Sequence, residues 1–462
     1  MFLDIDRIES SRIAAVDDSG RTVSYGDLVD FAKTFCGVLP RRTLMFIISE
    51  NSIGSLLGYV GALSNRIVPL ILSAKTETGL YQNLYGLYSP EYLWMPKLKQ
   101  ESAEGEAIFE AWDYVLVRTG LAAPPLYDDL SLLLPTSGST GSPKLVRHSY
   151  RNIEANAENV KNLFGLTSDE RAMAILPMHY TMGLSVIASH LKAGATLLLS
   201  GRSLLDANFW KMLKEERATS FTGVPYSYEL LMKLRFTRMD LPDLKIITQG
   251  GGKLTPEMFM ALADYAKASN KKFIPTYGQS ECTARMAYLP PELASTKICS
   301  IGIAEPGGKL SLIEDDGHET FEGEGTGEMV YRGENVTLGY ATCPEDLMKG
   351  DENHGVMHTG DLARRDADGC YYIVGRLKRF LKIFGLRIGL DEIENLVKAQ
   401  FGTDCLCSGT DELLTVNVAI KGKRSAIVDF IEEKTHLFRR AIEVCEVDSI
   451  ARNETGKVIL HK

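Results

Sequence analysis

The chain has 462 residues, of which 45% are hydrophobic and 24% are charged, and its formal net charge at pH 7 is −9. These values are typical of a globular protein with about three compact units, and they exclude the fibrous and disordered classes. An acidic balance without a long basic run argues against nucleic acid as a partner, because phosphate neutralisation needs clustered Lys and Arg.

Apolar strands alternate with helical patterns through the first 130 residues. Residues 43–49 form a buried-strand pattern, Ser52 begins a helix with apolar residues at helical spacing, and 68–72 is the next strand. The same alternation returns in three later strand segments, 172–176, 195–199 and 244–248. Near-continuous apolar strands separated by helices predict sheets covered on both faces, which is the α/β class.

The sequence pattern changes after residue 300, where glycines separate short strands of alternating apolar and polar residues such as 327–331. This pattern predicts a turn-rich β section. After Gly375 the pattern returns to mixed α and β, with a helix from Leu390 and a strand over 414–420.

The chain start lacks the basic head and apolar core of a signal peptide, and no apolar stretch reaches the length of a membrane span. We therefore expect a cytoplasmic protein without a membrane partner.

The eight cysteines are scattered, and the pair Cys405 and Cys407 lacks the second pair that a zinc site needs. We expect structural roles for them.

A phosphate-binding loop is predicted where the apolar strand 132–134 runs into glycines and small hydroxyl residues and ends in Pro-Lys. Glycines let backbone N–H groups turn toward an anion, hydroxyls donate further bonds, and a lysine adds a positive charge. The loop differs from the Walker pattern, which ends in Gly-Lys-Ser/Thr, and by itself it also fits a flexible linker. Its candidate phosphate-binding residues are Thr136, Ser137, Gly138, Ser139, Thr140, Gly141 and Lys144.

Five segments resemble, in order, the signature motifs of the adenylate-forming superfamily, which includes acyl-CoA synthetases, aryl ligases, peptide-synthetase adenylation domains and firefly luciferase. They are the loop 136–144, Tyr277-Gly278-Gln279-Ser280-Glu281, His358-Thr359-Gly360-Asp361, the hinge segment within 375–388 and Asn453-Glu454-Thr455-Gly456-Lys457. The resemblance implies a large N-terminal domain, 1–377, of two α/β sheets plus a distorted β-barrel. A small α+β domain, 378–462, would follow a hinge at Lys378.

The resemblance also implies roles in ATP binding. Glu281 would hold Mg²⁺, a hard cation that prefers carboxylate and phosphate oxygens; Tyr277 would stack on adenine, with Gly278 beside it; Ser280 would contact the α-phosphate. Asp361 would accept hydrogen bonds from the ribose hydroxyls, and Arg376 would donate to ribose or phosphate. Alternatively, Glu281 is a surface glutamate, Tyr277 is a core aromatic, Asp361 is an Asx-turn residue and Arg376 forms an ordinary ion pair.

The glycine corner Gly250-Gly251-Gly252-Lys253 lies between a buried strand and a helix. By resemblance it would line adenine and, with Thr276, the acyl pocket. A plain strand-to-helix turn is the alternative.

Lys457 would bridge the substrate carboxylate and the α-phosphate, because attack of one anion on another needs a positioned cation. By resemblance, Thr140, Lys144, Glu281 and Lys457 are the catalytic set. Gly385 would face the incoming thiol after the small domain rotates about Lys378.

The acyl pocket is expected to begin at His179 and Tyr180, where fatty-acyl members carry Phe-His and amino-acid-activating domains carry Phe-Asp. A buried substrate ammonium would need an anionic partner, and this segment has none. We therefore expect an acid without an α-amino group, although an amino-acid-activating enzyme stays an alternative. Tyr180 either binds a substrate hydroxyl or packs, and His179 fits a structural or a catalytic role.

The implied reaction is Mg²⁺-dependent activation of a small carboxylic acid by ATP, giving an acyl-adenylate and pyrophosphate. Transfer to coenzyme A, or to the phosphopantetheine of a separate acyl carrier protein, would follow. Gly389 and Asp391 replace the usual Glu and Gly of the thiol-facing segment, and these departures leave the acceptor open. A luciferase-like oxygenase and a non-catalytic nucleotide-binding protein are further alternatives.

Overall fold

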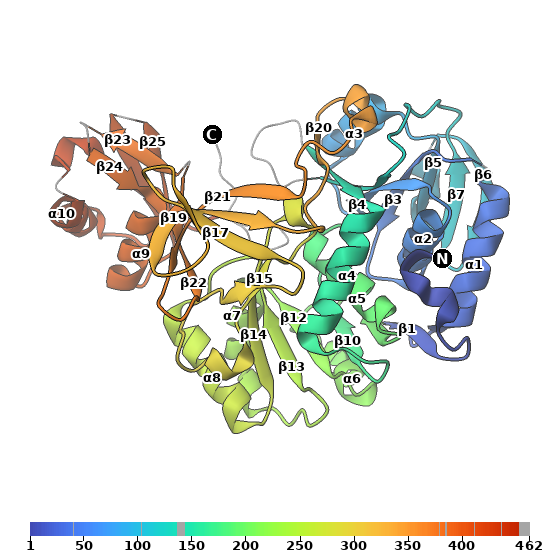
Figure 1. Ribbon diagram of the computed structural model, residues 1–462, viewed down its shortest axis with the longest axis horizontal. Helices are drawn as coiled ribbons and strands as arrows, with labels where there is room; N and C mark the ends of the chain where they lie inside the picture. Colours follow the sequence, from blue (N-terminus) through green and yellow to red (C-terminus); the bar gives the residue numbers. More distant parts are fainter. Residues whose placement is uncertain are drawn as a thin grey trace. The chain divides into compact units, whose positions relative to one another are not determined.

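The computed structural model describes residues 1–39, 41–102, 104–135, 144–377, 379–383, 386–410, 412–435 and 437–451 (Figure 1). The chain divides into two compact units. The large unit comprises Met1–Lys309 and Tyr331–Met357, and the small unit comprises Leu310–Val330 and His358–Lys462. The domain boundary expected at residues 377 and 378 stays a prediction.

The large unit contains an eight-stranded sheet in the order β20-β9-β8-β4-β3-β5-β7-β6. Its first two strands in the chain, β3 and β4, are parallel and almost wholly buried, as the apolar runs predict. The strands are β3 (Leu44–Ser49), β4 (Val68–Ser73), β5 (Tyr92–Pro96), β6 (Glu106–Ala111), β7 (Tyr114–Arg118), β8 (Leu130–Pro135), β9 (Leu145–Ser149) and β20 (Gly339–Ala341).

A second sheet of the large unit has nine strands in the order β16-β15-β14-β13-β12-β10-β11-β1-β2. The three strands predicted from the later apolar runs are β10, β11 and β13, and they pair in parallel with neighbours in this sheet. The strands are β1 (Ile13–Asp17), β2 (Thr22–Ser24), β10 (Arg171–Ala174), β11 (Thr196–Leu199), β12 (Ser220–Gly223), β13 (Ile246–Gln249), β14 (Lys272–Tyr277), β15 (Ala287–Tyr288) and β16 (Ile303–Ala304).

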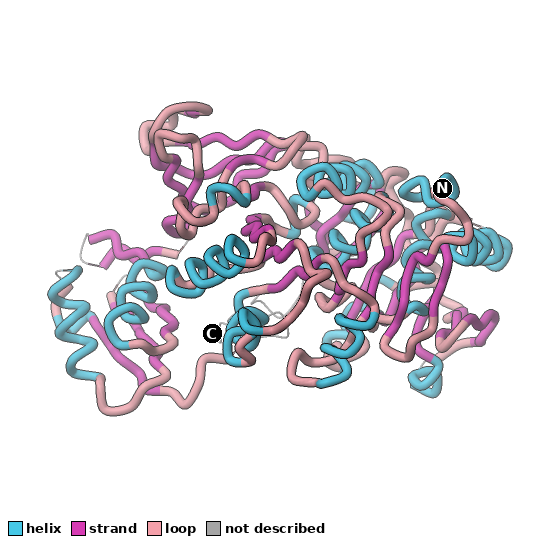
Figure 2. Tube along the Cα trace, turned by 90° about the horizontal axis from the view of Figure 1, so that it is seen from below, coloured by secondary structure: helices cyan, strands magenta, loops and turns pink. Residues whose placement is uncertain are grey.

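Helices lie between the two sheets and cover their other faces (Figures 1 and 2). Helix α4 packs on β8 and β9, α5 packs on β10 and β11, and the two helices pack on each other, so they join the sheets through one core. The helices of the large unit are α1 (Tyr25–Val38), α2 (Ile53–Ser64), α3 (Thr78–Tyr88), α4 (Tyr150–Phe164), α5 (Thr181–Lys192), α6 (Ala207–Glu215), α7 (Pro225–Lys233) and α8 (Pro256–Ala268).

Local sequence explains how these helices begin. Ser52 and Ser149 each accept a hydrogen bond from a backbone N–H of the first turn of α2 and α4.

Short 3₁₀ helices lie between the other elements or at their ends. They are η1 (Phe2–Arg7), η2 (Lys97–Ser102), η3 (Phe236–Arg238), η4 (Ser280–Cys282), η5 (Pro291–Leu293), η6 (Pro344–Met348) and η7 (Arg439–Ala441).

The turn-rich section, expected as a distorted β-barrel, forms a five-stranded sheet in the order β18-β17-β19-β21-β22. Its strands are β17 (Lys309–Ile313), β18 (Glu319–Thr320), β19 (Gly325–Arg332), β21 (Val356–Arg365) and β22 (Tyr371–Arg376).

The rest of the small unit is α+β, as expected. A three-stranded sheet packs on two helices through a core that includes Val397, Val416 and Ile427. The elements are β23 (Phe380–Ile383), β24 (Leu386–Gly389), α9 (Leu390–Phe401), β25 (Cys405–Thr410), β26 (Leu413–Val418), α10 (Arg424–Thr435) and β27 (Ile442–Glu446). Cys405 and Cys407 are buried in this core.

Among the described residues, no helix is long and apolar enough to cross a bilayer. No group of three or more His, Cys, Asp or Glu side chains there is arranged to hold a metal ion.

Candidate active site

The predicted phosphate loop joins β8 to β9, which pair antiparallel with Pro135 opposite Leu145. Its residues Thr136, Ser137, Gly138, Ser139, Thr140 and Gly141 lie outside the described residues. Lys144, at the far end of the loop, is described and exposed. Its Nζ lies 5.4 Å from the ring centroid of Tyr340, on β20.

The second motif begins where β14 ends, at Tyr277. Gly278 is required there, because a Cβ at this position would lie 1.5 Å from the carbonyl oxygen of Ala284. The chain then turns through η4, and the Ser280 hydroxyl accepts a hydrogen bond of 2.9 Å from the hydroxyl of Thr181. Thr181 is the first residue of α5, so the motif meets the segment that opens the predicted acyl pocket.

The Glu281 side chain is half-buried, and its carboxylate is held by a contact with a tyrosine. The Tyr340 hydroxyl donates to Glu281 Oε1 at 2.6 Å, and the N–H and hydroxyl of Thr337 both donate to the Glu281 carbonyl oxygen at 3.0 Å. Burial raises the pKa of Tyr340, and the nearby Glu281 charge raises it further, so the phenol stays protonated. A fixed, partly exposed carboxylate fits a Mg²⁺ site, because Mg²⁺ binds one or two carboxylates together with phosphate oxygens.

The predicted pocket residues Tyr180, Gly250, Gly251 and Thr276 come together. Gly251 has φ +76°, and a Cβ on it would lie 2.7 Å from the Tyr180 hydroxyl oxygen. A Cβ on Gly250 would lie 2.8 Å from Thr276 Oγ1. Tyr180 packs against a small apolar cluster of the described chain, Leu176, Met182, Val224 and Ala284.

The surroundings of Tyr180 are mainly apolar. Burial raises the pKa of Tyr180, which keeps the phenol uncharged. His179 is half-buried beside it. The Gln249 amide donates to the carbonyl oxygens of Gly250 and Gly252 at 3.1 and 2.6 Å, which braces the glycine corner, while Gly252 and Lys253 are exposed.

Two predicted nucleotide-binding residues meet in the small unit. Asp361 on β21 lies opposite Arg376 on β22, and Arg376 Nε is 3.0 Å from Asp361 Oδ1. The backbone before Asp361 is fixed by Thr359, whose hydroxyl donates to the Met329 carbonyl oxygen at 2.6 Å. The remaining predicted residues Lys378, Gly385 and Lys457 lie outside the described residues.

Sequence reasoning missed Thr181 and Tyr340. Thr181 lies directly after His179 and Tyr180, so the same segment indicated it. Tyr340 follows Gly339, which has φ +121°, a value that favours glycine. A Gly-Tyr pair at the end of a glycine-rich section was the signal available for it.

The AMP-binding enzyme family model matches residues 88–341. An indoleacetate–CoA ligase of Aromatoleum aromaticum is 30% identical over 369 residues, which cover 75% of this chain and 70% of that protein. An oxalate–CoA ligase of Arabidopsis thaliana is 31% identical over 272 residues, which cover 58% of this chain and 52% of that protein. The chain thus spans about half the length of the latter relative.

Solved structures of similar fold cover nearly the whole chain. An o-succinylbenzoate coenzyme A synthetase from Bacillus subtilis in complex with AMP has a TM-score of 0.79 at 19% identity, covering 99% of this chain and 96% of that one. An ATP-bound MatB from Rhodopseudomonas palustris has a TM-score of 0.76 at 20% identity, covering 99% and 96%. At these identities the likeness is one of fold.

Proposed function

The chain belongs to the family of AMP-binding enzymes, and from this premise we propose that it joins a carboxylic acid to a thiol. In the first step a carboxylate oxygen attacks the α-phosphorus of ATP, pyrophosphate leaves and an acyl-adenylate forms. In the second step a thiolate attacks the acyl carbon, AMP leaves and a thioester forms.

The first step brings two anions together, so it needs positive charge at the α-phosphate. We assign this role to Lys144 and Lys457, with the Thr140 hydroxyl donating to phosphate oxygens. Mg²⁺, held by Glu281, would neutralise phosphate charge. Ser280 would contact the α-phosphate.

The residues proposed for nucleoside binding are the following. We assign adenine to Tyr277 and to the backbone of the glycine corner, from Gly251 to Lys253. The ribose hydroxyls would donate to Asp361, and Arg376 would donate to ribose or phosphate.

The acid we propose lacks an α-amino group and carries an apolar or aromatic body. The apolar cluster beside Tyr180 supports an apolar or aromatic body, and His179 and Tyr180 offer no carboxylate to a buried ammonium. The Tyr180 hydroxyl would bind a hydroxyl or carbonyl of such an acid. The similarity to an indoleacetate–CoA ligase and to a feruloyl-CoA synthase supports the same class.

The thiol we propose is coenzyme A, since the similar proteins are named as CoA ligases and synthetases. The phosphopantetheine of a separate carrier protein is the alternative acceptor. Exchange between the two steps would use the hinge at Lys378 and bring Gly385 toward the thiol.

One observation carries the proposal. The lysine that closes the phosphate loop and the glutamate suited to Mg²⁺ both contact Tyr340, through its ring and its hydroxyl. These two residues are far apart in the sequence, and their shared contact with Tyr340 supports a phosphate-binding charge and a cation-binding charge close together. That pairing is what adenylation needs.

The test is pyrophosphate release from ATP and Mg²⁺ across a panel of aryl, hydroxy, branched, short-chain and amino acids. We expect release to depend on an aryl or apolar acid and to fall by about two orders of magnitude or more in Glu281→Gln. Glu292→Gln, which changes an exposed carboxylate of the same unit, should match the wild type. Pyrophosphate release that does not depend on any acid would contradict the proposal. Pyrophosphate release with amino acids alone would contradict the assigned acid class.

A further inference from the structure

Tyr340 touches both charged residues to which the proposed function assigns phosphate and cation binding. Its hydroxyl donates to Glu281 Oε1 at 2.6 Å, and Lys144 Nζ lies 5.4 Å from its ring centroid. We propose that Tyr340 is a positioning residue, which fixes the Glu281 carboxylate for Mg²⁺ and sets its spacing from Lys144. This inference rests on the proposed function.

The backbone of Tyr340 is itself held rigidly by the strand that follows the phosphate loop. Strand β20 pairs antiparallel with β9, so Tyr340 lies opposite Val146 and Gly339 lies opposite Arg147. Gly339 has φ +121°, and a Cβ on it would lie 2.8 Å from Glu352 Oε2. Glycine is therefore required directly before Tyr340.

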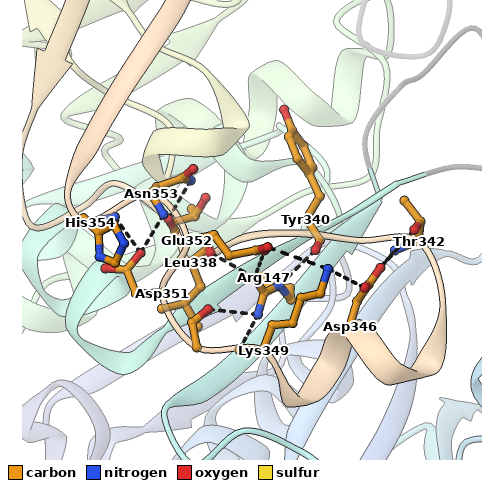
Figure 3. Close-up of polar contacts among 12 residues, drawn as sticks. Arg147, Leu338, Tyr340, Thr342, Asp346, Lys349, Asp351, Glu352, Asn353 and His354 are labelled. Atoms are coloured by element: carbon orange, nitrogen blue, oxygen red, sulfur yellow. Dashed lines mark hydrogen bonds and ion pairs between the residues drawn. The ribbon is translucent and has the colours of Figure 1, made fainter.

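Arg147 anchors the segment that carries Tyr340 (Figure 3). Its side chain is fully buried, its Nε donates to the Tyr340 carbonyl oxygen at 3.0 Å, and its Nη2 donates to the Leu338 carbonyl oxygen at 3.0 Å. Its remaining donors reach Glu352 and the carbonyl oxygens of Lys349 and Gly350. A guanidinium has five N–H donors in a fixed fork, so these contacts fix the backbone on both sides of Tyr340.

The turn after Tyr340 is closed by a second set of polar contacts, also drawn in Figure 3. Asp346 accepts hydrogen bonds from the N–H and the hydroxyl of Thr342 at 2.7 and 2.9 Å, and Lys349 Nζ lies 2.8 Å from the Asp346 carboxylate. Tyr340 therefore projects from a segment whose backbone is braced on both sides, and its hydroxyl bonds to Glu281 Oε1.

The consequence for a cation follows from the chemistry of the hydrogen bond. A hydroxyl that donates to a carboxylate restricts the rotamers of that carboxylate. Because the bond uses Oε1, Oε2 is the oxygen that Glu281 would offer to a cation. Residues that orient metal ligands in this way typically contribute about 10–100-fold in metal affinity.

Two variants distinguish the role of the Tyr340 hydroxyl from the role of its ring. Mn²⁺, which reports binding directly by electron paramagnetic resonance, is titrated into full-length enzyme with a non-hydrolysable ATP analogue. We expect Tyr340→Phe to weaken Mn²⁺ binding about tenfold, with unchanged affinity for the analogue measured in EDTA and unchanged Tm. Tyr340→Leu, which also removes the ring beside Lys144, should in addition weaken binding of the analogue in EDTA.

The matched control is Tyr372→Phe, which removes another tyrosine hydroxyl that donates to a carboxylate, that of Asp366 at 3.2 Å. It should leave Mn²⁺ binding at the wild-type value. Wild-type Mn²⁺ affinity in Tyr340→Phe would overturn the inference and leave the proposed function standing. Absence of nucleotide-dependent Mn²⁺ binding in the wild type would overturn the proposed function together with the inference.

Discussion

Asp361 and Arg376 form an ion pair across two adjacent strands, with the Nε of Arg376 3.0 Å from Oδ1 of Asp361. Only 5% of the Asp361 side-chain surface is exposed, against 61% for Arg376. The carboxylate is thus fixed by its surroundings, whereas the guanidinium reaches into solvent. Such a carboxylate is ordered in advance to accept hydrogen bonds from a diol, and the arginine limits the cost of burying its charge.

Removal of the Asp361 charge should weaken nucleotide binding. We predict that Asp361→Asn lowers ATP affinity about tenfold or more, because hydrogen bonds to a charged group contribute about 1.5–3 kcal/mol. Calorimetric titration with ATP measures the change. Asp368→Asn, at an exposed position in the hairpin between the same strands, is the matched control and should bind ATP as the wild type does. Equal affinities in both variants would contradict the assignment of Asp361.

Gly251 should be essential for the acyl pocket. We predict that Gly251→Ala abolishes acid-dependent pyrophosphate release or raises the KM for the acid strongly, because the new methyl group would lie 2.7 Å from the Tyr180 hydroxyl. Gly120→Ala controls for backbone strain, since Gly120 has φ +79°, close to the +76° of Gly251, with no atom within 4 Å of a Cβ. Steady-state kinetics on both variants measure the effect, and equal losses would show that strain alone is responsible.

Arg147 should contribute strongly to stability. We predict that Arg147→Met lowers the free energy of unfolding by about 3 kcal/mol, because four buried or part-buried carbonyl oxygens lose their donor. Arg151→Met is the control, since Arg151 is 72% exposed and pairs with the exposed Glu334, and such pairs contribute about 0–1 kcal/mol. Urea unfolding measures both. A small loss in Arg147→Met would show that the hairpin of Tyr340 is held by other contacts.

Stability should fall as pH rises through neutrality to about 8, because of Glu305. Burial raises the pKa of Glu305 to about 8, against opposing hydrogen bonds from Asn159 and Tyr331 and the charge of Arg285. Since the folded-state pKa exceeds the unfolded value, the folded state holds the extra proton, and this stability is lost as pH rises through about 8.

The loss between pH 6.5 and 8 should be about 2 kcal/mol at most. Urea unfolding at several pH values in this window measures it. The buried histidines His148 and His190, whose pKa values are lowered to about 3 and about 4 by burial, affect stability at lower pH. Glu305→Gln should flatten the profile, and an unchanged slope in that variant would assign the titration to another group.

Local patterns in the sequence predicted much of the fold. The segments 43–49 and 68–72 are strands because they are buried on both faces, and continuous apolar runs indicate that directly. Ser52 begins a helix because its hydroxyl satisfies a backbone N–H, which is also a local signal. The α/β class followed from these elements.

Contacts between distant segments were less visible. Tyr340 lies 59 residues from Glu281, and their contact depends on the pairing of β20 with β9, which no local pattern encodes. The grouping of Leu310–Val330 with His358–Lys462 likewise depends on β19 lying beside β21 in one sheet. The motif resemblance, by contrast, indicated Tyr180 and Gly251 together, and the structure brings them into contact.

In the proposed first step, a carboxylate oxygen of the substrate attacks the α-phosphorus of ATP. The direct measurement uses an acid active in the pyrophosphate assay, labelled with ¹⁸O in its carboxylate, together with ATP and coenzyme A, and determines by mass spectrometry where the label goes. The account predicts AMP carrying one ¹⁸O atom, because the bridging oxygen of the adenylate stays with phosphorus when the thiol attacks the acyl carbon. Unlabelled AMP, or ADP as the nucleotide product, would contradict it.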